Sequence, residues 1–259
     1  MSPLLQPPGL GVGGTLGTVR GNEAPEVRLR WPGLDPLRPT LDILIFDDSG
    51  SLTGQGGNDP VGNRYAEAGR AVRLLSHWSR SSRQQVATIH FDYPAVAVTG
   101  PHRLDRSAPR QRVLAALHEP RNALGSSALT PAMTAANKLA REHGGICRCT
   151  IFSDFELMDA NPNQPYEEAA KFPGLIHAIV LNASPPHRLT RLNNVTTTHI
   201  ASDSPPGLTA AALMHSLATG RRGARRSVLR MSRPRDPADR PPPRSSRLPP
   251  RSRASRAPA

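Results

Sequence analysis

The chain has 259 residues, enough for one α/β domain with extensions. No apolar run approaches the roughly 18 residues that a membrane span requires, and the first residues lack the basic stretch and apolar core of a secretory signal. Two cysteines are too few for a disulfide framework. The composition therefore argues against a membrane-spanning or disulfide-rich protein and predicts a soluble cytoplasmic one.

The positive charge is concentrated at one end of the chain. The net charge is +13, and residues Arg221 to Ala259 hold 13 arginines against two aspartates, so everything before them carries only about +2. This segment is rich in Arg, Pro, Ser and Ala, and it has too few large apolar residues to offset its ordering entropy. We therefore predict a disordered, Arg/Pro-rich basic tail over residues 220–259. The arginine bias suits phosphate binding and a GC-rich coding sequence equally well.

Between the two ends, the composition predicts one domain. Residues 1–25 are rich in Gly and Pro and are expected to be a flexible leader. Residues 26–40 could supply a short edge strand before two prolines interrupt it. The domain is expected to span residues 26–219, with its core over about 41–219.

Within that core, strand and helix patterns alternate along the chain. Short, mostly apolar runs predict strands at 41–46, 86–91, 95–98, 147–152 and 175–181, and a final strand is expected at 195–200. Helical patterns lie at about 65–75, 110–118, 130–140, 166–170 and 208–217, and Thr130 is expected to cap its helix ahead of Pro131. This alternation predicts a three-layer, doubly wound α/β fold, with helices on both faces of a mostly parallel sheet. Ligands of such sheets bind at the carboxyl ends of the strands.

Polar residues follow the first predicted strand in the sequence Asp47-Asp48-Ser49-Gly50-Ser51. Here the chain resembles the von Willebrand factor A family, whose metal-ion-dependent adhesion site begins with Asp-x-Ser-x-Ser. Asp47, Ser49 and Ser51 match that motif. The family's second element, a hydroxyl residue in a Gly-rich loop before a helix, corresponds to Ser127, and its third, an Asp at the end of a later strand, to Asp154. The resemblance covers roughly residues 41–219 and implies the family's Rossmann-like fold.

The resemblance further implies a divalent metal, Mg²⁺ or Mn²⁺, held by Asp47, Ser49, Ser51, Ser127 and Asp154. Such hard cations prefer oxygen ligands. In the family, one coordination position stays open for an acidic residue on a partner protein. Two departures stand out: Ser127 replaces the usual Thr, and Phe155 replaces the Gly that commonly follows the strand-end Asp, where it is expected to narrow the rim of the site.

Other polar residues have plainer interpretations. A lone Asp-x-Ser-x-Ser is often only turn and cap chemistry, and the metal prediction depends on three elements occurring in order. Asp48 is expected to be solvated, and Glu156 and Asp159 to be loop acids. The remaining candidates are expected to lie in the core without binding metal: Cys147, Cys149, His90 and His177. No nucleophile–base pair is apparent, so an enzyme is not expected.

Two functions remain open. The resemblance implies a metal-dependent protein–protein interaction module, an intracellular bacterial adaptor acting with a partner such as an AAA-type ATPase or a stress or defence complex. The alternative is a nucleic-acid-associated protein tethered through the basic tail, which would bind without sequence preference and with strong salt dependence. The tail could also be a low-information extension with no function.

Overall fold

The computed structural model describes residues 31–53, 63–91, 96–118 and 127–224, together with the single residues Val27, Leu29 and Asp59. The predicted leader and most of the predicted basic tail lie outside these residues. None of the helices in the described part of the chain is long and apolar enough to cross a membrane.

Six strands form one sheet in the order β3-β2-β1-β4-β5-β6. Neighbouring strands are parallel except β3, which pairs antiparallel with β2 at the edge. The strands are β1 (Thr40–Asp47), β2 (Gln84–Phe91), β3 (Ala97–Arg103), β4 (Ile146–Ser153), β5 (Leu175–Leu181) and β6 (Val195–Ile200).

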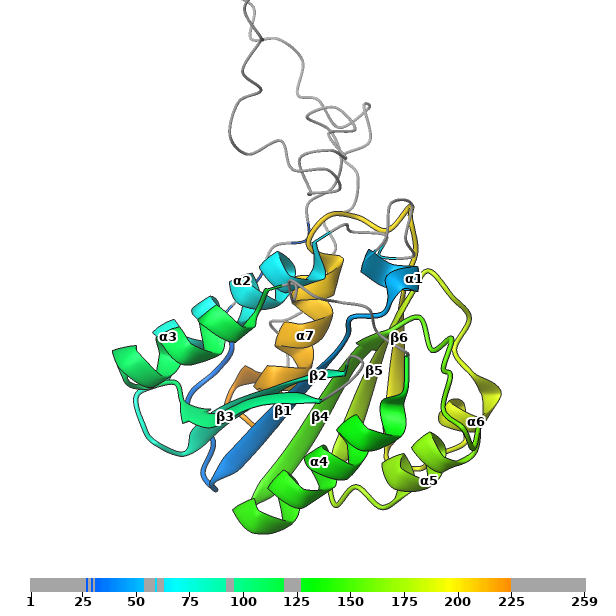
Figure 1. The fold of residues 1–259 in the computed structure, drawn as a ribbon. Helices are drawn as coiled ribbons and strands as arrows, with labels where there is room; N and C mark the ends of the chain where they lie inside the picture. The colour runs from blue at the N-terminus through cyan, green and yellow to red at the C-terminus, as the bar shows by residue number, and fades with distance from the viewer. Residues whose placement is uncertain are drawn as a thin grey trace, which may run out of the picture.

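Helices cover both faces of this sheet (Figure 1). One face is covered by α2 (Arg64–His77), α3 (Ser107–Ala116) and α7 (Leu208–Ala218), and the other by α4 (Leu129–His143), α5 (Gln164–Ala170) and α6 (His187–Thr190); the short α1 (Gly50–Thr53) follows β1. The predicted fold class, a three-layer α/β structure with a mostly parallel sheet, is therefore confirmed.

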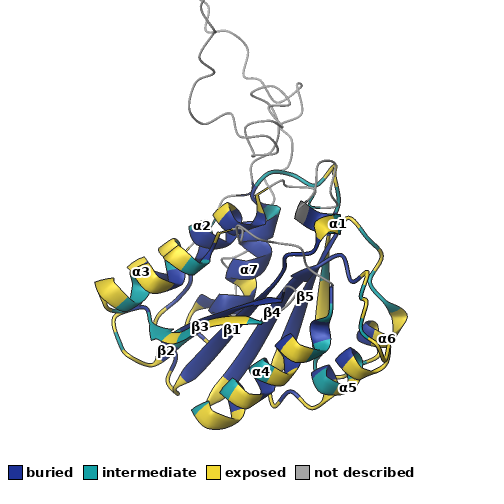
Figure 2. Cartoon of the chain, viewed as in Figure 1, coloured by how far each residue is buried: buried dark blue, intermediate teal, exposed yellow. Residues whose placement is uncertain are grey.

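The central strand β1 is buried along its whole length, as a strand covered on both faces must be (Figure 2). Because successive side chains point to opposite faces, Leu44 and Phe46 join the core under α2 and α7, while Ile43 and Ile45 join the core under α4. The same alternation sends Asp47 and its neighbour Asp48 in opposite directions.

Two of the predicted strands differ in the structure. Among the described residues before Pro36 no strand is formed, and Leu34 makes an isolated antiparallel bridge to Arg222. The third strand runs over Ala97–Arg103 and not over 95–98, and its side chains are mostly half-buried or exposed. A strand at the edge packs on one side only, so the short apolar run was a poor guide to where it begins.

The residues just after α7 belong to the folded domain. Arg221 is 4% exposed, forms an ion pair with Asp35 at 3.3 Å, and donates to the carbonyl oxygens of Gly33 and Trp78. It also donates to Gln84, on the sheet face that α7 covers. Ala224 is buried in the same core. The tail was predicted to begin at residue 220, but residues 220–224 pack on the domain; residues 225–259 are not described.

Candidate metal site

The predicted site lies where the strand order reverses. From β1 the chain builds β2 and β3 on one side and then returns to place β4 on the other. In open α/β sheets, this switch point leaves a crevice at the carboxyl ends of the strands. Asp47 is the last residue of β1, and Asp154 directly follows β4, which pairs with β1. Both carboxyl groups are therefore placed at the crevice, and both residues are buried.

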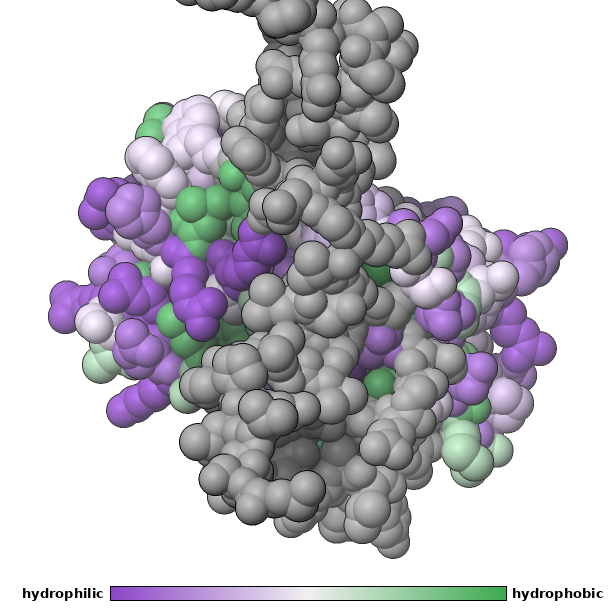
Figure 3. All heavy atoms as spheres, turned by 90° about the horizontal axis from the view of Figure 1, so that it is seen from above, coloured by the Kyte–Doolittle hydropathy of each residue, from purple (hydrophilic) through white to green (hydrophobic). Residues whose placement is uncertain are grey.

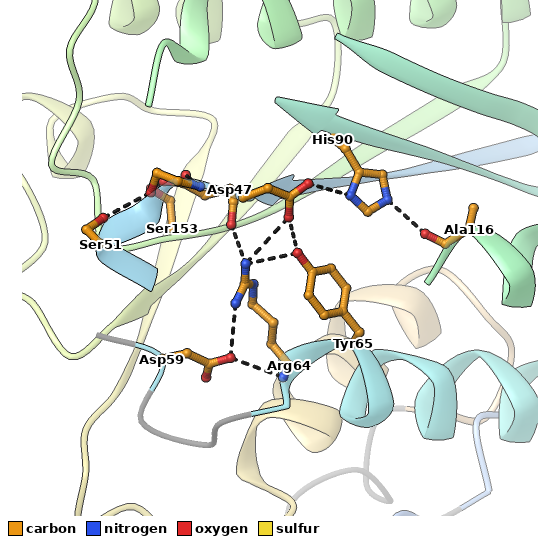
Figure 4. Close-up of polar contacts among 10 residues, drawn as sticks. Asp47, Ser51, Asp59, Arg64, Tyr65, His90, Ala116 and Ser153 are labelled. Atoms are coloured by element: carbon orange, nitrogen blue, oxygen red, sulfur yellow. Dashed lines mark hydrogen bonds and ion pairs between the residues drawn. The ribbon is translucent and has the colours of Figure 1, made fainter. Parts of the chain in front are cut away.

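Hydrogen bonds fold the first motif into a compact turn (Figure 4). One carboxylate oxygen of Asp47 accepts from the backbone N–H of Ser49 at 3.0 Å, and the other accepts from the Ser153 hydroxyl at 2.6 Å. The hydroxyl oxygens of Ser49 and Ser51 lie 2.9 Å apart. The motif residues Asp47, Ser49 and Ser51 are thus held together in one turn at the end of β1.

The other two predicted ligands lie in loops that are bonded to each other. The backbone N–H of Met158, four residues after Asp154, donates to the carbonyl oxygen of Ser127 at 3.2 Å. A carboxylate oxygen of Asp154 accepts from the N–H of Glu156 at 3.1 Å. Ser127 is buried and has φ 52°. This left-handed conformation disfavours β-branched residues, which gives a physical reason for Ser where the family usually has Thr.

The site is electrostatically strained without a cation. Burial raises the pKa of Asp47 to about 6. The hydrogen bonds from Ser153 and Ser49 favour the charged form but do not compensate, and the negative charge of Asp154 raises the pKa further. A bound cation would relieve both effects.

The available donors suit a hard divalent cation. Two carboxylates and three hydroxyls are oxygen ligands of the kind that Mg²⁺ and Mn²⁺ prefer. In the described part of the chain, no group of three or more His, Cys, Asp or Glu residues is placed to hold a metal; the candidate site has two carboxylates, and its other donors are serine hydroxyls. Cys147 and Cys149 are buried free thiols, as expected.

The prediction that Asp48 is solvated was wrong. Its side chain points to the α2 side of the sheet and is fully buried, with Tyr65, His90 and Arg64 around it. The Tyr65 hydroxyl donates to it, His90 Nδ1 lies 2.8 Å from it, and Arg64 forms an ion pair with it at 3.5 Å. Arg64 also donates to the carbonyl oxygen of Asp47, so this buried cluster contacts the backbone of the Asp-x-Ser-x-Ser motif from the α2 side of the sheet (Figure 4).

Both histidines predicted to be satisfied core residues are buried and have hydrogen-bond partners. His177 Nε2 lies 2.8 Å from the Thr198 hydroxyl oxygen. His90 Nε2 lies 2.8 Å from the carbonyl oxygen of Ala116, while its other ring nitrogen faces Asp48. The ring also stacks on Phe46 with centroids 5.3 Å apart.

Phe155 does not narrow the rim, contrary to expectation. Its φ is 59°, and its ring is buried in the core on the α4 side of the sheet. The left-handed backbone explains why the family commonly has Gly here. In this chain the strain of a non-glycine residue is offset by the apolar surface that the ring buries.

The predicted cap of α4 was also wrong, because the cap comes from a residue distant in sequence. Thr130 lies inside the helix, and its hydroxyl has no hydrogen-bond partner in the described structure. The two carboxylate oxygens of Asp159 accept instead, from the N–H groups of Leu129 at 3.0 Å and Thr130 at 2.9 Å. A carboxylate there satisfies two free donors and favours the helix dipole.

We expect Asp159→Ala to destabilise the fold by about 1–2 kcal/mol, the usual effect of losing an N-cap. Since Ser127 lies just before α4, the same change should weaken metal binding without removing a ligand. Thermal unfolding and metal titration would measure both, with Asp159→Asn, which keeps one acceptor oxygen, as the intermediate control. An Asp159→Ala variant as stable as the wild type would show that the cap is not needed.

Comparison with known proteins places the fold but not the family. No protein-family model matches the sequence, and no curated protein sequence matches it. Among solved structures, the pilus adhesin SpaC from Lactobacillus rhamnosus GG is similar over 72% of this chain and 31% of its own, with TM-score 0.55 and 12% identity. Its open conformation gives TM-score 0.53 at 12% identity over 72% of this chain.

The byssus protein proximal thread matrix protein 1 from the mussel, solved with zinc in its MIDAS motif, gives TM-score 0.48 and 14% identity over 72% of this chain and 48% of its own. The match to the pilus adhesin covers about a third of that protein's length. At these identities the likeness concerns the fold alone.

Proposed function

We propose that the domain is a protein-binding module that acts through a divalent cation, Mg²⁺ or Mn²⁺, held by Asp47, Ser49, Ser51, Ser127 and Asp154. The observation that carries this proposal is the pair of buried carboxylates at the switch point of the sheet, with serine hydroxyls gathered beside them. Buried charges of like sign are retained in proteins where a partner or a metal compensates them.

Each residue has a role in this proposal. The hydroxyls of Ser49, Ser51 and Ser127 would be ligands, and the carboxylates of Asp47 and Asp154 would supply the negative charge, directly or through water. The bound cation would supply an open coordination position for a carboxylate of the partner. The roles proposed for these residues are to hold the cation and to present it to a partner, so the module is proposed to bind and not to catalyse.

The rim favours a particular kind of partner. Met158 follows in the loop that is bonded to Ser127, and it is 75% exposed. An acidic side chain flanked by an apolar one would engage both the cation and this methionine, whose flexible thioether adapts to varied surfaces.

The first test is thermal unfolding in Mg²⁺, in Mn²⁺ and in chelator. A cation present at a hundredfold excess over its Kd stabilises the native state by about 2.7 kcal/mol, which raises the melting temperature by roughly 5–10 °C for a domain of this size. Asp154→Ala should lose this gain, while Glu156→Ala, which removes an exposed carboxylate two residues away, should keep it. Identical wild-type curves with metal and with chelator would disprove the metal site.

The second test separates metal binding from partner binding. Proteins recovered from a lysate on the wild-type chain in Mg²⁺ should be absent when chelator is added or when Asp154→Ala or Ser127→Ala is used. Partners that bind Asp154→Ala as well as the wild type would show that another surface carries the interaction.

A further inference from the structure

The folded domain carries a basic groove between α2 and α3. Its volume is about 510 Å³, and it is lined by Arg73, Ser76 and His77 from α2 and by Arg110, Gln111, Leu114 and Ala115 from α3. Hydrophilic residues, drawn purple, cover much of the side of the molecule where these two helices lie (Figure 3). The groove lies on the α2 and α3 side of the sheet, and none of its lining residues belongs to the proposed metal site.

The positive charge of this groove is not neutralised by its neighbours. Arg73 and Arg110 form no ion pair with any residue that the structure describes. The acid on α2, Glu67, is buried, bonded to Arg70 at 3.2 Å and to the N–H of Ala210 at 3.2 Å. No acid occurs in α3, and Asp105 ahead of it is bonded to Arg103 at 2.7 Å.

The basic residues also form an extended stripe. Arg70, Arg73 and His77 recur at helical spacing along α2 and therefore share a face, and Arg80 follows just after the helix. Arg106, four residues before Arg110, lies at the start of the neighbouring helix. Arg70 and His77 are about two helical turns apart, roughly 10 Å at a rise of 1.5 Å per residue. This face can therefore contact more than one anionic group along a chain.

Two exposed tryptophans lie at one end of this stripe. Trp78 directly follows α2, and its ring lies 5.5 Å from the ring of the groove residue His77. Trp31 packs edge-on against Trp78 with centroids 6.3 Å apart. Each tryptophan is nearly 40% exposed (38% and 39%). Large aromatic surfaces left open beside arginines are the combination that binds unpaired bases by stacking and their backbone by charge.

From this juxtaposition we propose that the α2–α3 groove binds single-stranded nucleic acid. The guanidinium groups of Arg73 and Arg110 contact phosphates, for which their planar forks are suited, and Trp78 and Trp31 offer a surface for a base. An acidic peptide would use the arginines but leave the tryptophans without a role. The site belongs to the folded domain and is distinct from the basic tail.

The chain provides its own reporter for this site. Its two tryptophans are Trp31 and Trp78, so quenching of intrinsic fluorescence reports binding beside these rings. The chain at Gly223 also lies against the Trp31 ring, so the arginine variants below separate binding in the groove from binding by the tail. The full chain is titrated in chelator with a twelve-residue oligodeoxythymidine, and binding is followed in parallel by the anisotropy of a labelled copy. The wild type should be quenched as the anisotropy rises.

Arg73→Gln/Arg110→Gln should weaken the affinity seen by quenching about tenfold or more. The slope of the logarithm of the affinity against the logarithm of the salt concentration should also become smaller by roughly 1.4, at about 0.7 for each lost phosphate contact. The matched control, Arg141→Gln/Arg191→Gln, removes two exposed arginines from the opposite side of the sheet and should bind as the wild type does. Arg110→Gln alone should have an intermediate affinity, and it replaces the double variant in the comparison if the double variant unfolds.

Three results would overturn the proposal. The first is a rise in anisotropy without quenching, which would place the nucleic acid on the tail. The second is equal quenching of the wild type and the double variant. The third is an acidic peptide such as hexaglutamate that quenches the fluorescence as strongly as the oligonucleotide does and displaces the oligonucleotide. This result would make the groove a site for acidic proteins. Because all titrations are run in chelator, failure of the metal site would leave this test unaffected.

Discussion

Ending the chain after Thr219 is expected to lower its melting temperature by roughly 10 °C, whereas ending it after Ala224 is expected to shift it by less than about 2 °C. The five residues between these two ends include Arg221, whose guanidinium is buried against the carboxylate of Asp35 and two carbonyl oxygens. Removing one partner of such a buried pair typically costs about 3–5 kcal/mol, and each kcal/mol shifts the melting temperature of a domain this size by about 2–4 °C.

The residues after Ala224 should behave differently because their composition offers almost no apolar surface to pack. The single change Arg221→Ala in the full chain should reproduce most of the loss, and Arg221→Lys should recover only part of it, since lysine lacks the planar fork. Thermal unfolding of the two shortened chains and two variants would decide the matter. Equal melting temperatures for the two shortened chains would mean that Arg221 contributes nothing to the fold.

Local patterns in the sequence were sufficient to predict most of the fold. The strands at 175–181 and 195–200 have the predicted bounds. The first is a buried apolar run, and the second is a mostly exposed or half-buried edge strand rich in β-branched threonines. The five candidate ligands could also be proposed from local signals, because each follows a strand or precedes a helix. Their binding of metal remains a prediction.

What could not be predicted depends on residues that are distant in the chain. Asp159 caps a helix that begins thirty residues earlier, and Arg221 pairs with Asp35 across the whole domain. Asp48 was expected in solvent because aspartates usually are, but the strand alternation turns it toward Tyr65 and His90, which close over it. No periodicity in the sequence marks such pairings.

The distribution of charge over the surface likewise could not be predicted from local patterns in the sequence. The residues before the tail sum to about +2, so the sequence assigned the basic character to the tail and not to the folded part. In the structure, acids such as Glu67 and Asp42 are buried with partners, while Arg73 of α2 and Arg110 of α3 form no ion pair with any described residue. An average over the chain conceals a local excess that folding creates.

The last prediction concerns Asp47, whose carboxylate should destabilise the metal-free protein. Its pKa is about 6 in the folded chain against an ordinary value of 3.8, so folding favours the protonated form. The stability associated with this proton is fully present below about pH 3.8 and is lost as the pH rises through about 6. At pH 7.5 in chelator, the buried charge should cost the wild type up to about 3 kcal/mol, since one pKa unit corresponds to about 1.4 kcal/mol.

Asp47→Asn should therefore stabilise the protein in chelator at pH 7.5, by about 1–3 kcal/mol. The amide oxygen can still accept from the N–H of Ser49, and its NH₂ group can donate to the Ser153 hydroxyl, so both hydrogen bonds have replacements. At pH 4 the advantage should disappear, because the wild-type carboxyl is then neutral as well. In saturating Mg²⁺ at pH 7.5 the order should reverse, since the wild type gains from the cation and the variant has lost a charged ligand.

Thermal unfolding of both proteins at pH 4 and pH 7.5, with Mg²⁺ and with chelator, would measure all of these differences. A variant that is less stable than the wild type in chelator at pH 7.5 would show that the carboxylate's hydrogen bonds outweigh the cost of burying its charge. In that case the motif would be a self-sufficient turn, and its geometry would no longer require a cation.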